Sequence, residues 1–397
     1  MFRNPFSDTE IARRLETLRA AVDQRHLAAA VISAPENIFY LIGLDHWGYF
    51  APHLLVVPVD GVPVLVTRSM ERGTIEVQVR AALFRGHTDS ETVSEMALQV
   101  LKELRLEGAP LGLEYWTSGL SYGLGTALSS QLDTSWHDIT GVVDAMRLVK
   151  SDEEIALMRI TAAISDAAAE AAIAVVEDGS PESEVAATCM AAMIRAGGHP
   201  PGFGPFIRAR GRFGEEHATW GDGRHKKGEA VFLELSGCVS RYHAPLGRLV
   251  HVGVAPEEDL AMAEVVQAAF EAVVAALKPG ARACEVYAAW QGVVDSAGLS
   301  HYRRHHCGYA VGIGVHPSWT GGSSVTGLRQ DSDLEIKPGM TFHVLSWLIG
   351  TGRGDGFFSN TVLVGPDGAE VLTSTSGRGD PDRRGVIYGG AAQGKNR

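Results

Sequence analysis

The run from Val231 to Val250, VFLELSGCVSRYHAPLGRLV, combines a strand pattern with polar side chains that strands do not normally bury. Apolar residues alternate on both sides of Glu234, which predicts a buried strand carrying a carboxylate. A second run, Gly247 to Val254, is close enough to pair with it as a twisted hairpin. An ionised carboxylate in such a place is unfavourable unless it is paired, hydrogen-bonded or used in chemistry, for example to bind a cation or to activate water.

A surface-facing glutamate on an edge strand is the alternative interpretation of Glu234. The polar residues of the following segment favour a functional site instead: Arg241, Tyr242, His243 and Arg248. Glu234 is therefore our first candidate for a catalytic residue.

Length, charge and composition exclude several classes of function. A chain of 397 residues predicts two domains, and 45% hydrophobic with 21% charged residues is typical of a soluble globular protein. The net charge of -12 argues against a nucleic-acid surface, because phosphate contacts need clustered Lys and Arg. The N-terminus has no apolar core of a signal peptide and no segment reaches the length of a membrane span, so we expect neither export nor membrane insertion.

The four cysteines are scattered without C-x-x-C spacing: Cys189, Cys238, Cys284 and Cys307. This pattern indicates reduced thiols rather than a zinc site or a disulfide framework. We therefore expect a cytoplasmic protein.

Residues 1–150 alternate helix and strand patterns, which predicts an α/β domain. The segments are, in order, a helix from Ser7 to Gln24, the strand LAAAVIS, the helix NIFYLIG, the hairpin HLLVVPVDGVPVLVT turning at Asp60-Gly61, the helix SETVSEMALQVLKEL and the strand APLGLEY. Ser151 can cap the next helix, whose first turn is acidic, so we place the domain boundary close to Lys150.

The second part of the chain contains an internal repeat. DGSPESEVAATCMAAMIRAGG and PGARACEVYAAWQGVVDSAGL align without a gap, pairing Gly179 with Gly280 and Gly197 with Gly298. A long helix precedes each copy and hairpin-like strands follow it. Two such helix-helix-hairpin units would bury their sheets with the helices outside and leave a cleft between the halves.

These features together resemble the creatinase/aminopeptidase P family, whose second domain has the pita-bread fold. The resemblance rests on the repeat, on RLVKSDEEIALMR, on KPGMTF and on FFSNTVLV, and it covers residues 8–376. It implies an α/β architecture with a smaller creatinase-type domain over residues 1–150 and a pita-bread catalytic domain over 151–376. We expect a disordered tail at residues 377–397.

The metallopeptidases of this family use five ligands, four carboxylates and one histidine. The corresponding positions in this chain are Glu234, Pro245, Tyr309, Leu345 and Ser359. One carboxylate in five cannot hold two divalent ions, which need several oxygen or nitrogen ligands at short range. A site rebuilt from other histidines is the alternative: His305, His306, His316 or His343. The sequence therefore predicts no metal and no other cofactor.

Among the metal-free members, the chain is most similar to ectoine hydrolases. They share the hairpin run of Glu234 to Arg248, together with HATW, KPGMTFH and the GY of GYAVG. The similarity implies that His217 is the proton-handling histidine, on the strand before the hairpin. It departs at Asn360, where these enzymes carry Glu, and at His316.

The implied chemistry is hydrolysis of a C–N bond in a cyclic amidine, most simply the ring opening of ectoine to N-acetyl-diaminobutyrate. A protonated amidine is already electrophilic, so a carboxylate such as Glu234 and an imidazole such as His217 suffice. The alternatives are a creatine-type amidinohydrolase, a metal-dependent Xaa-Pro aminopeptidase or dipeptidase, and a binding protein without catalysis. The expected contacts to the small-molecule substrate are Tyr309, His316, Tyr242, His243, Arg241, Trp220, Asn360 and Trp47.

The loop from Leu44 to His53, LDHWGYFAPH, carries Trp47 and two further aromatic rings beside the first hairpin. Such rings are unfavourable on a free surface, although they could instead pack inside the N-terminal domain. The family resemblance implies a homodimer in which this loop reaches the cleft of the neighbouring copy and contacts substrate.

Overall fold

A computed structural model describes residues 4–375. By their internal contacts these residues divide into two compact units, residues 4–147 with 321–324, and residues 148–320 with 325–375. The disordered tail predicted for residues 377–397 lies outside the described part of the chain. Among residues 4–375, none of the helices combines the length and the apolar character that crossing a membrane requires.

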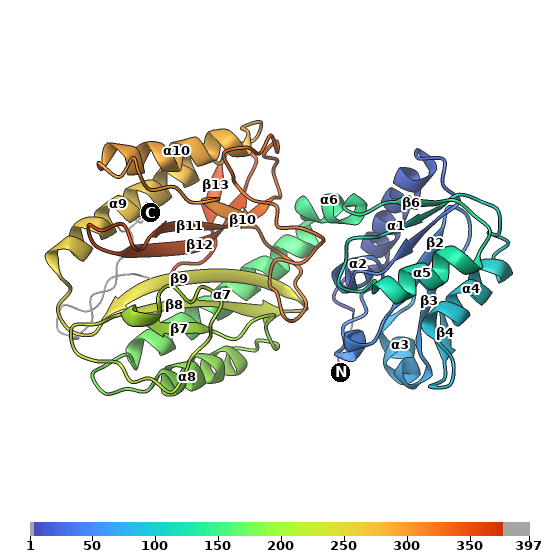
Figure 1. The fold of residues 1–397 in the computed structure, drawn as a ribbon, viewed down its shortest axis with the longest axis horizontal. Helices are drawn as coiled ribbons and strands as arrows, with labels where there is room; N and C mark the ends of the chain where they lie inside the picture. The colour runs from blue at the N-terminus through green and yellow to red at the C-terminus, as the bar shows by residue number, and fades with distance from the viewer. Residues whose placement is uncertain (1–3, 376–397) are drawn as a thin grey trace. The chain divides into compact units, whose positions relative to one another are not determined.

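The N-terminal unit is built on a six-stranded sheet in the order β4-β3-β2-β1-β5-β6 (Figure 1). Its elements are α1 (Asp8–Asp23), β1 (Ala29–Ile32), α2 (Pro35–Ile42), η1 (Gly48–Phe50), β2 (Leu54–Pro58), β3 (Val64–Arg68), η2 (Ser69–Glu71), α3 (Arg72–Gln78), β4 (Leu83–His87), α4 (Val93–Glu103), β5 (Leu111–Leu113), α5 (Tyr122–Gln131), β6 (Trp136–Asp138) and α6 (Val142–Leu148). β2 runs antiparallel to both neighbours, and the other pairs are parallel. The predicted helices, strands and hairpin of this region are confirmed.

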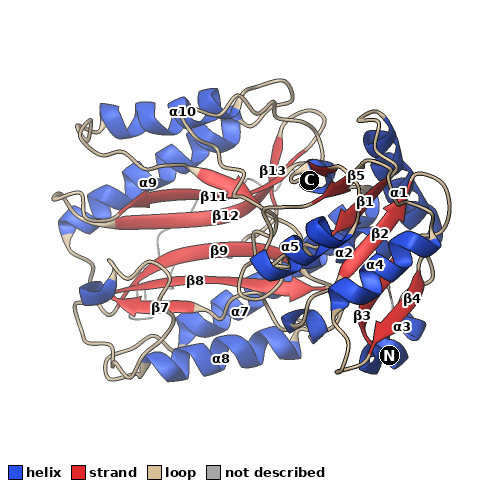
Figure 2. Cartoon of the chain, turned by 45° about the vertical axis from the view of Figure 1, so that its right-hand side comes forward, coloured by secondary structure: helices blue, strands red, loops and turns tan. Residues whose placement is uncertain are grey.

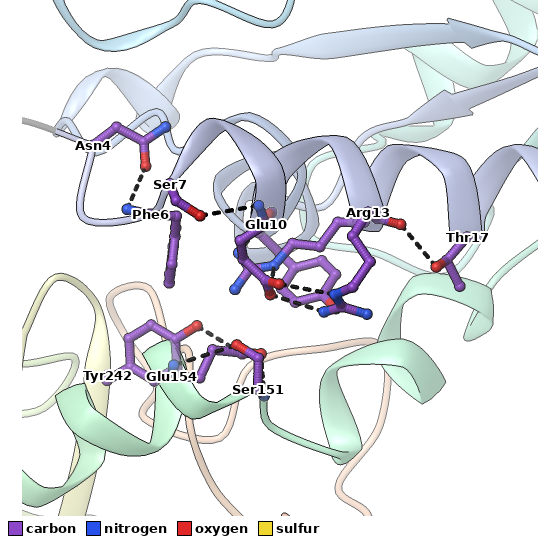
Figure 3. A network of polar contacts seen from close by, with 11 residues as sticks. Asn4, Phe6, Ser7, Glu10, Arg13, Thr17, Ser151, Glu154 and Tyr242 are labelled. Atoms are coloured by element: carbon purple, nitrogen blue, oxygen red, sulfur yellow. Dashed lines mark hydrogen bonds and ion pairs between the residues drawn. The ribbon is translucent and has the colours of Figure 1, made fainter.

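The first helix begins where its sequence predicts. Ser7 caps α1 by accepting a hydrogen bond from the backbone nitrogen of Glu10 at 3.1 Å (Figure 3). The Glu10 carboxylate in turn pairs with Arg13 and with the buried Arg14, each at 2.8 Å. The capping hydroxyl and the acidic first turn therefore fix the start of the helix.

The C-terminal unit repeats one order of elements, two helices followed by three strands. These are α7 (Asp152–Ala174), α8 (Glu182–Arg195), β7 (Phe206–Ala209), η3 (Arg210–Arg212), β8 (Ala230–Val239), β9 (Tyr242–His251), then α9 (Glu257–Ala276), α10 (Ala283–Ser296), β10 (Gly308–Ala310), β11 (Thr341–Leu348), β12 (Gly356–Val364) and finally β13 (Ala369–Val371). The strands form one seven-stranded sheet, in which β9 pairs with β12 and so joins the two copies. The predicted repeat is confirmed.

The helices of the C-terminal unit all pack on one face of this curved sheet. In Figures 1 and 2, α7 lies along β8 and β9 and α9 lies along β11 and β12, while α8 packs beside α7 and α10 beside α9. Each half has its own apolar core between its helices and its strands. As predicted, Ser151 caps α7, and it forms a capping box with Glu154 (Figure 3).

Strand alternation decides which side chains lie on the other face, away from the helices. In β8, Val231, Leu233 and Leu235 belong to the core beneath α7, so Phe232 and Glu234 point the opposite way. That opposite face carries a cluster of aromatic residues from both halves, including Phe206, Phe232, Trp319, Trp347 and Phe357. Glu234 therefore stands in an aromatic setting and is 7% exposed, which rules out the surface-facing alternative.

The β8–β9 hairpin is longer than the sequence indicated. We expected its second strand to begin at Gly247, but β9 begins at Tyr242 and pairs with β8 over its full length. The turn consists of Ser240 and Arg241, both with positive φ, at 46° and 65°. A tight turn of this kind keeps the strands in register and brings Tyr242 and His243 into the sheet.

Candidate active site

The aromatic face of the C-terminal unit encloses a cavity of about 450 Å³. Its wall is formed by acidic, basic and aromatic side chains from both halves of the repeat, among them Phe203, Phe206, Glu216, His217, Glu234, Arg304, His305, His306, Tyr309, Trp319, Arg329 and Trp347. A cavity lined by several aromatic residues together with a few charged groups is typical of a small-molecule site.

Glu234 is the buried carboxylate of this cavity. Within residues 4–375 its carboxylate accepts no hydrogen bond, and the ring nitrogen Nε2 of His343 lies 3.9 Å from Oε1. Burial raises the pKa of Glu234 to about 7, against the lowering effect of the Arg208 guanidinium. A carboxyl group with this pKa can take up and release a proton near neutral pH.

Arg208 lies on β7, on the same face as Glu234, and is fully buried. Its guanidinium stacks over the Phe232 ring, 4.3 Å from the centroid, and Nη1 donates hydrogen bonds to the backbone carbonyls of Glu215 and Glu216. The Glu216 carboxylate accepts a hydrogen bond from Arg304 at 3.0 Å. Arg208 thus fixes the loop that follows β7 and adds positive charge near Glu234.

His217 lies in this loop and contributes to the cavity wall, as Glu234 does. The prediction that His217 lies on the strand before the hairpin is wrong. β7 ends at Ala209, and the short helix η3 turns the chain out of the sheet. His217 is consequently exposed, with its ring 6.3 Å from that of Phe206, and its catalytic role stays a prediction.

Tyr309 joins the cavity from the second half and belongs to a chain of polar contacts. Its hydroxyl oxygen accepts a hydrogen bond from the Trp319 indole at 3.0 Å and lies 2.9 Å from Nδ1 of His343. Nε2 of His343 lies 2.7 Å from the Ser359 hydroxyl. The structure thereby adds two residues that the predicted site lacked, His343 and Trp319. Alternation in FHVLSW could have placed His343 on the face of Leu345 and Trp347, but only strand register brings it to Tyr309.

The side chains of two predicted substrate contacts, Tyr242 and His243, form hydrogen bonds that hold the fold. The Tyr242 hydroxyl donates to Glu154 of α7 at 2.7 Å (Figure 3). His243 accepts a hydrogen bond from the backbone nitrogen of Gly202 at 2.8 Å, so its other ring nitrogen donates to the Arg241 carbonyl at 2.8 Å. Burial lowers the pKa of His243 to about 4, which keeps it neutral. Their contact with a substrate stays a prediction.

The remaining predicted contacts are not among the residues that line the cavity. Asn360 is on the helix-facing side of β12, where its side-chain oxygen accepts a hydrogen bond from the buried Arg248 at 3.0 Å. His316 is exposed, and its Nδ1 lies 3.0 Å from the Gly202 carbonyl oxygen. Trp220 is 40% exposed beside Gly204, and Trp47, in the N-terminal unit, is 56% exposed. The roles of these four residues stay predictions. For Asn360, a position on the helix-facing side of β12 argues against contact with a substrate.

The five positions that correspond to metal ligands do not fit a pair of divalent ions. Glu234 is the one carboxylate among the five positions. The other four positions are also on strands of the sheet and carry Pro245, Tyr309, Leu345 and Ser359. Residues 4–375 contain no group of three or more His, Cys, Asp or Glu side chains arranged to hold a metal ion. Two dications beside one carboxylate would be left badly undercompensated.

Two family models together match most of the chain. That of metallopeptidase family M24 matches residues 156–366, and that of the creatinase/prolidase N-terminal domain matches residues 14–149. The chain belongs to metallopeptidase family M24. It has the pita-bread fold of this family, preceded by a creatinase-type N-terminal domain, and at this general level it is a hydrolase.

Relatives with different activities are equally similar to this M24 protein. It is 26% identical to the ectoine hydrolase of Halomonas elongata, with 93% of this chain and 96% of that protein covered. It is also 26% identical to the Xaa-Pro dipeptidase of Pyrococcus horikoshii, with 89% and 95% covered. The crystal structure of the prolidase from Pyrococcus horikoshii superposes with a TM-score of 0.79 at 23% identity, covering 92% and 99%. These likenesses support the fold and leave the substrate open.

Proposed function

We propose that this M24 protein opens a cyclic amidine by hydrolysis of a C–N bond without a metal ion, with ectoine, opened to N-acetyl-diaminobutyrate, as the leading substrate. The observation that carries the proposal is Glu234, a buried carboxylate that accepts no hydrogen bond from the described residues and faces a cavity of about 450 Å³. An amidinium carries one positive charge and two N–H donors in one plane, so it can satisfy this carboxylate in charge and in hydrogen bonding.

The reaction follows from these groups. The electrophilic amidinium carbon bonds either to the oxygen of a water that gives its proton to Glu234, or to Glu234 itself. In the second case a water must afterwards attack the same carbon, break its bond to Glu234 and so regenerate the carboxylate. When the C–N bond breaks, the leaving nitrogen takes a proton, which we assign to His217 on the same cavity wall. Tyr309 donates a hydrogen bond to the charge that develops on the substrate.

Cationic groups elsewhere on the wall support a zwitterionic substrate. Arg304 and Arg329 both line the cavity, Arg304 with its guanidinium 4.8 Å from the Trp347 ring centroid. Ectoine and creatine each combine a cationic C–N centre with a carboxylate, so either molecule matches a cavity that offers both signs of charge. The relative named ectoine hydrolase favours the first.

The test is turnover of a substrate panel by the purified protein. Ectoine, hydroxyectoine, creatine and Xaa-Pro dipeptides are each incubated with wild type and with Glu234→Gln, and products are followed by mass spectrometry. We expect ring opening of ectoine by wild type alone. Turnover of creatine in place of ectoine would keep the proposed C–N hydrolysis and replace ectoine as the substrate. Turnover of dipeptides alone would reject the proposal.

An Xaa-Pro dipeptidase is the second candidate, because relatives with that activity are as similar as the ectoine hydrolase. It would need a metal site other than the family's five positions. Among the histidines named in the sequence analysis, His305 and His306 do lie together on the cavity wall, with ring centroids 4.1 Å apart. Burial lowers the pKa of both, which would leave them neutral, but within residues 4–375 they belong to no group of three or more His, Cys, Asp or Glu side chains that could hold a metal ion.

We further propose that the protein acts as a homodimer in which Trp47 reaches the cavity of the neighbouring copy. Trp47 and Phe50 are 56% and 79% exposed, although both are large aromatic residues. Trp47→Ala should raise KM about tenfold with little change in thermal stability, as expected when one aromatic contact worth about 1–2 kcal/mol is lost. A monomer by light scattering with unaltered KM for the variant would reject this arrangement.

A further inference from the structure

Four side chains from the second half of the repeat form a continuous line of polar contacts behind the cavity. In order they are Trp319, Tyr309, His343 and Ser359, with donor–acceptor distances of 3.0, 2.9 and 2.7 Å. Trp319, His343 and Ser359 are buried, and Tyr309 lines the cavity. Tyr309 and Ser359 occupy two of the family's metal-ligand positions, so uncharged groups stand here where a metallopeptidase would have charged ones.

The direction of each hydrogen bond in this line depends on one proton of His343. Burial lowers the pKa of His343 well below its usual value, so the ring is neutral and carries a hydrogen on one nitrogen only. The Trp319 indole can only donate, so the Tyr309 oxygen must accept from it. Two arrangements of the remaining hydrogens are then possible.

In the first arrangement, Tyr309 donates to Nδ1 of His343, and Nε2–H of His343 donates to Ser359. The Tyr309 hydroxyl hydrogen is then turned away from the cavity. In the second, Ser359 donates to Nε2, and Nδ1–H of His343 donates to Tyr309. Tyr309 then accepts two hydrogen bonds, and its own O–H must point into the cavity, where it becomes a stronger donor because its oxygen is polarised from both sides.

The carboxylate of Glu234 biases this choice. It lies 3.9 Å from Nε2 of His343, so an unpaired negative charge there attracts Nε2–H and favours the first arrangement. A cation bound to Glu234 cancels that attraction and releases the second. The state of Glu234 is thereby passed to Tyr309 through one imidazole.

We propose that His343, held by Ser359, is a positioning residue that turns the Tyr309 hydroxyl toward the substrate once a cation has bound to Glu234. The inference rests on the proposed amidine chemistry and deepens it, because it makes the hydrogen-bond donor respond to the charge of the substrate. Trp319 contributes by occupying one acceptor site of Tyr309 in both arrangements. The residue that touches substrate is Tyr309, and His343 acts through it.

A double-mutant cycle on kcat tests the positioning role. Tyr309→Phe should lower kcat about 100-fold with little change in KM, as for loss of one donor to developing charge. If His343 acts through Tyr309, the variant His343→Gln should be slower than wild type, and the double variant Tyr309→Phe/His343→Gln no slower than Tyr309→Phe alone. Losses that multiply in the double variant would overturn the inference.

Two amide variants of His343, His343→Asn and His343→Gln, distinguish the two ring nitrogens. The asparagine amide can replace Nδ1–H toward Tyr309, whereas the glutamine amide reaches the position of Nε2. We expect kcat of His343→Asn to exceed that of His343→Gln, with equal melting temperatures. The reverse order would show that the Ser359 side of the ring matters for another reason and would overturn the inference.

A readout without turnover separates this inference from the proposed function. With 15N-labelled histidine, the nitrogen shifts of His343, assigned by their loss in His343→Asn, report which ring nitrogen carries the hydrogen. Acetamidinium should bind to wild type and not to Glu234→Gln, and should increase the Nδ1–H form. Binding without that increase overturns the positioning role alone. Failure of acetamidinium to bind overturns the amidine proposal and the positioning role with it.

Discussion

Glu114 in the N-terminal unit and Glu234 in the C-terminal unit are both buried, and burial raises the pKa of each to about 7. Their surroundings differ. Glu114 accepts hydrogen bonds from the backbone nitrogens of Ser33 and Ala34 at 2.8 and 2.9 Å. It accepts a third from the Asn37 amide at 2.6 Å. Glu234 accepts none from the part of the chain that the structure describes, and it faces a cavity.

The comparison shows that a raised pKa alone does not identify an active site. Glu114 directly follows β5, and its carboxylate reaches the segment between β1 and α2, a helix whose N-cap residue, Ala34, has no capping side chain. The carboxylate of Glu114 serves the backbone N–H groups at that helix start instead. Glu234 has the same burial without the same partners, so its hydrogen-bonding capacity is left for a ligand.

The largest expected difference between Glu234 and Glu114 is in their effect on catalytic rate. Glu234→Gln should lower kcat/KM at least about 100-fold, because the amide keeps the shape of the side chain and removes the charge that pairs with an amidinium. The measurement is steady-state hydrolysis of whichever amidine the panel identifies. A variant that retains more than about a tenth of the wild-type rate would remove Glu234 from its assigned role.

Glu114→Gln is the matched control. Its single amide oxygen can accept on one side only, so its NH2 group would face either the two backbone N–H donors or the Asn37 amide, and the variant should lose about 1–3 kcal/mol of unfolding free energy. Its kcat/KM per folded molecule should equal that of wild type. Equal losses of activity in the two variants would mean that Glu234, like Glu114, matters for folding only.

His217 tests whether the exposed side of the cavity takes part in the chemistry. His217→Ala should lower kcat about 100-fold and leave the melting temperature unchanged, because the ring is exposed and contributes little packing. A variant with undiminished kcat would remove His217 from the proton transfer.

Wild type and Glu234→Gln should also differ, by a smaller effect than the loss of turnover, in how their unfolding free energy changes with pH. Because burial raises the pKa of Glu234 in the folded protein to about 7, above its ordinary value of 4.5, protonation of this group favours the folded state at low pH. That contribution is lost as pH rises from about 4.5 to 7, by up to about 3 kcal/mol. Denaturant unfolding should therefore show Glu234→Gln gaining on wild type over this range. Parallel pH curves would contradict the raised pKa.

Metal removal should have no effect. One carboxylate among the five ligand positions cannot compensate two dications, whereas it matches one organic cation. Dialysis against a strong chelator should leave turnover undiminished, with substoichiometric metal by elemental analysis. Loss of activity that Mn²⁺, Zn²⁺ or Co²⁺ restores would replace the amidine hydrolase with a peptidase.

The sequence was sufficient for most of the architecture because long periodic segments and the repeat carry strong signals. α1, α4 and α7 each combine an amphipathic pattern with a capping residue, and the repeat predicted the order of helices and strands. Elements such as β6 and β10 span three residues each, too few to show a period. They exist because neighbouring strands offer hydrogen bonds.

The site was harder to predict because it depends on register and on which face a side chain takes. Glu234 and Tyr309 were found from their motifs, and both line the cavity. His343 lies in the recognised KPGMTFH segment, yet its contacts with Tyr309 and Ser359 arise from pairing across three strands. Asn360 is adjacent to Ser359 in sequence, but strand alternation directs it to the opposite face.

The two halves of the repeat meet where Gly247 and Arg248 of β9 pair with Ser359 and Phe358 of β12. A side chain at Gly247 would collide with Phe357, its first atom 2.2 Å from the ring, so glycine is needed for this close approach. Each half keeps its own core on its own side of the junction. Duplication of one ancestral half followed by independent divergence would let one copy acquire the carboxylate and the other the hydroxyl and imidazole groups. New chemistry could then evolve on the sheet face opposite the helices without a change in the core that stabilises either copy.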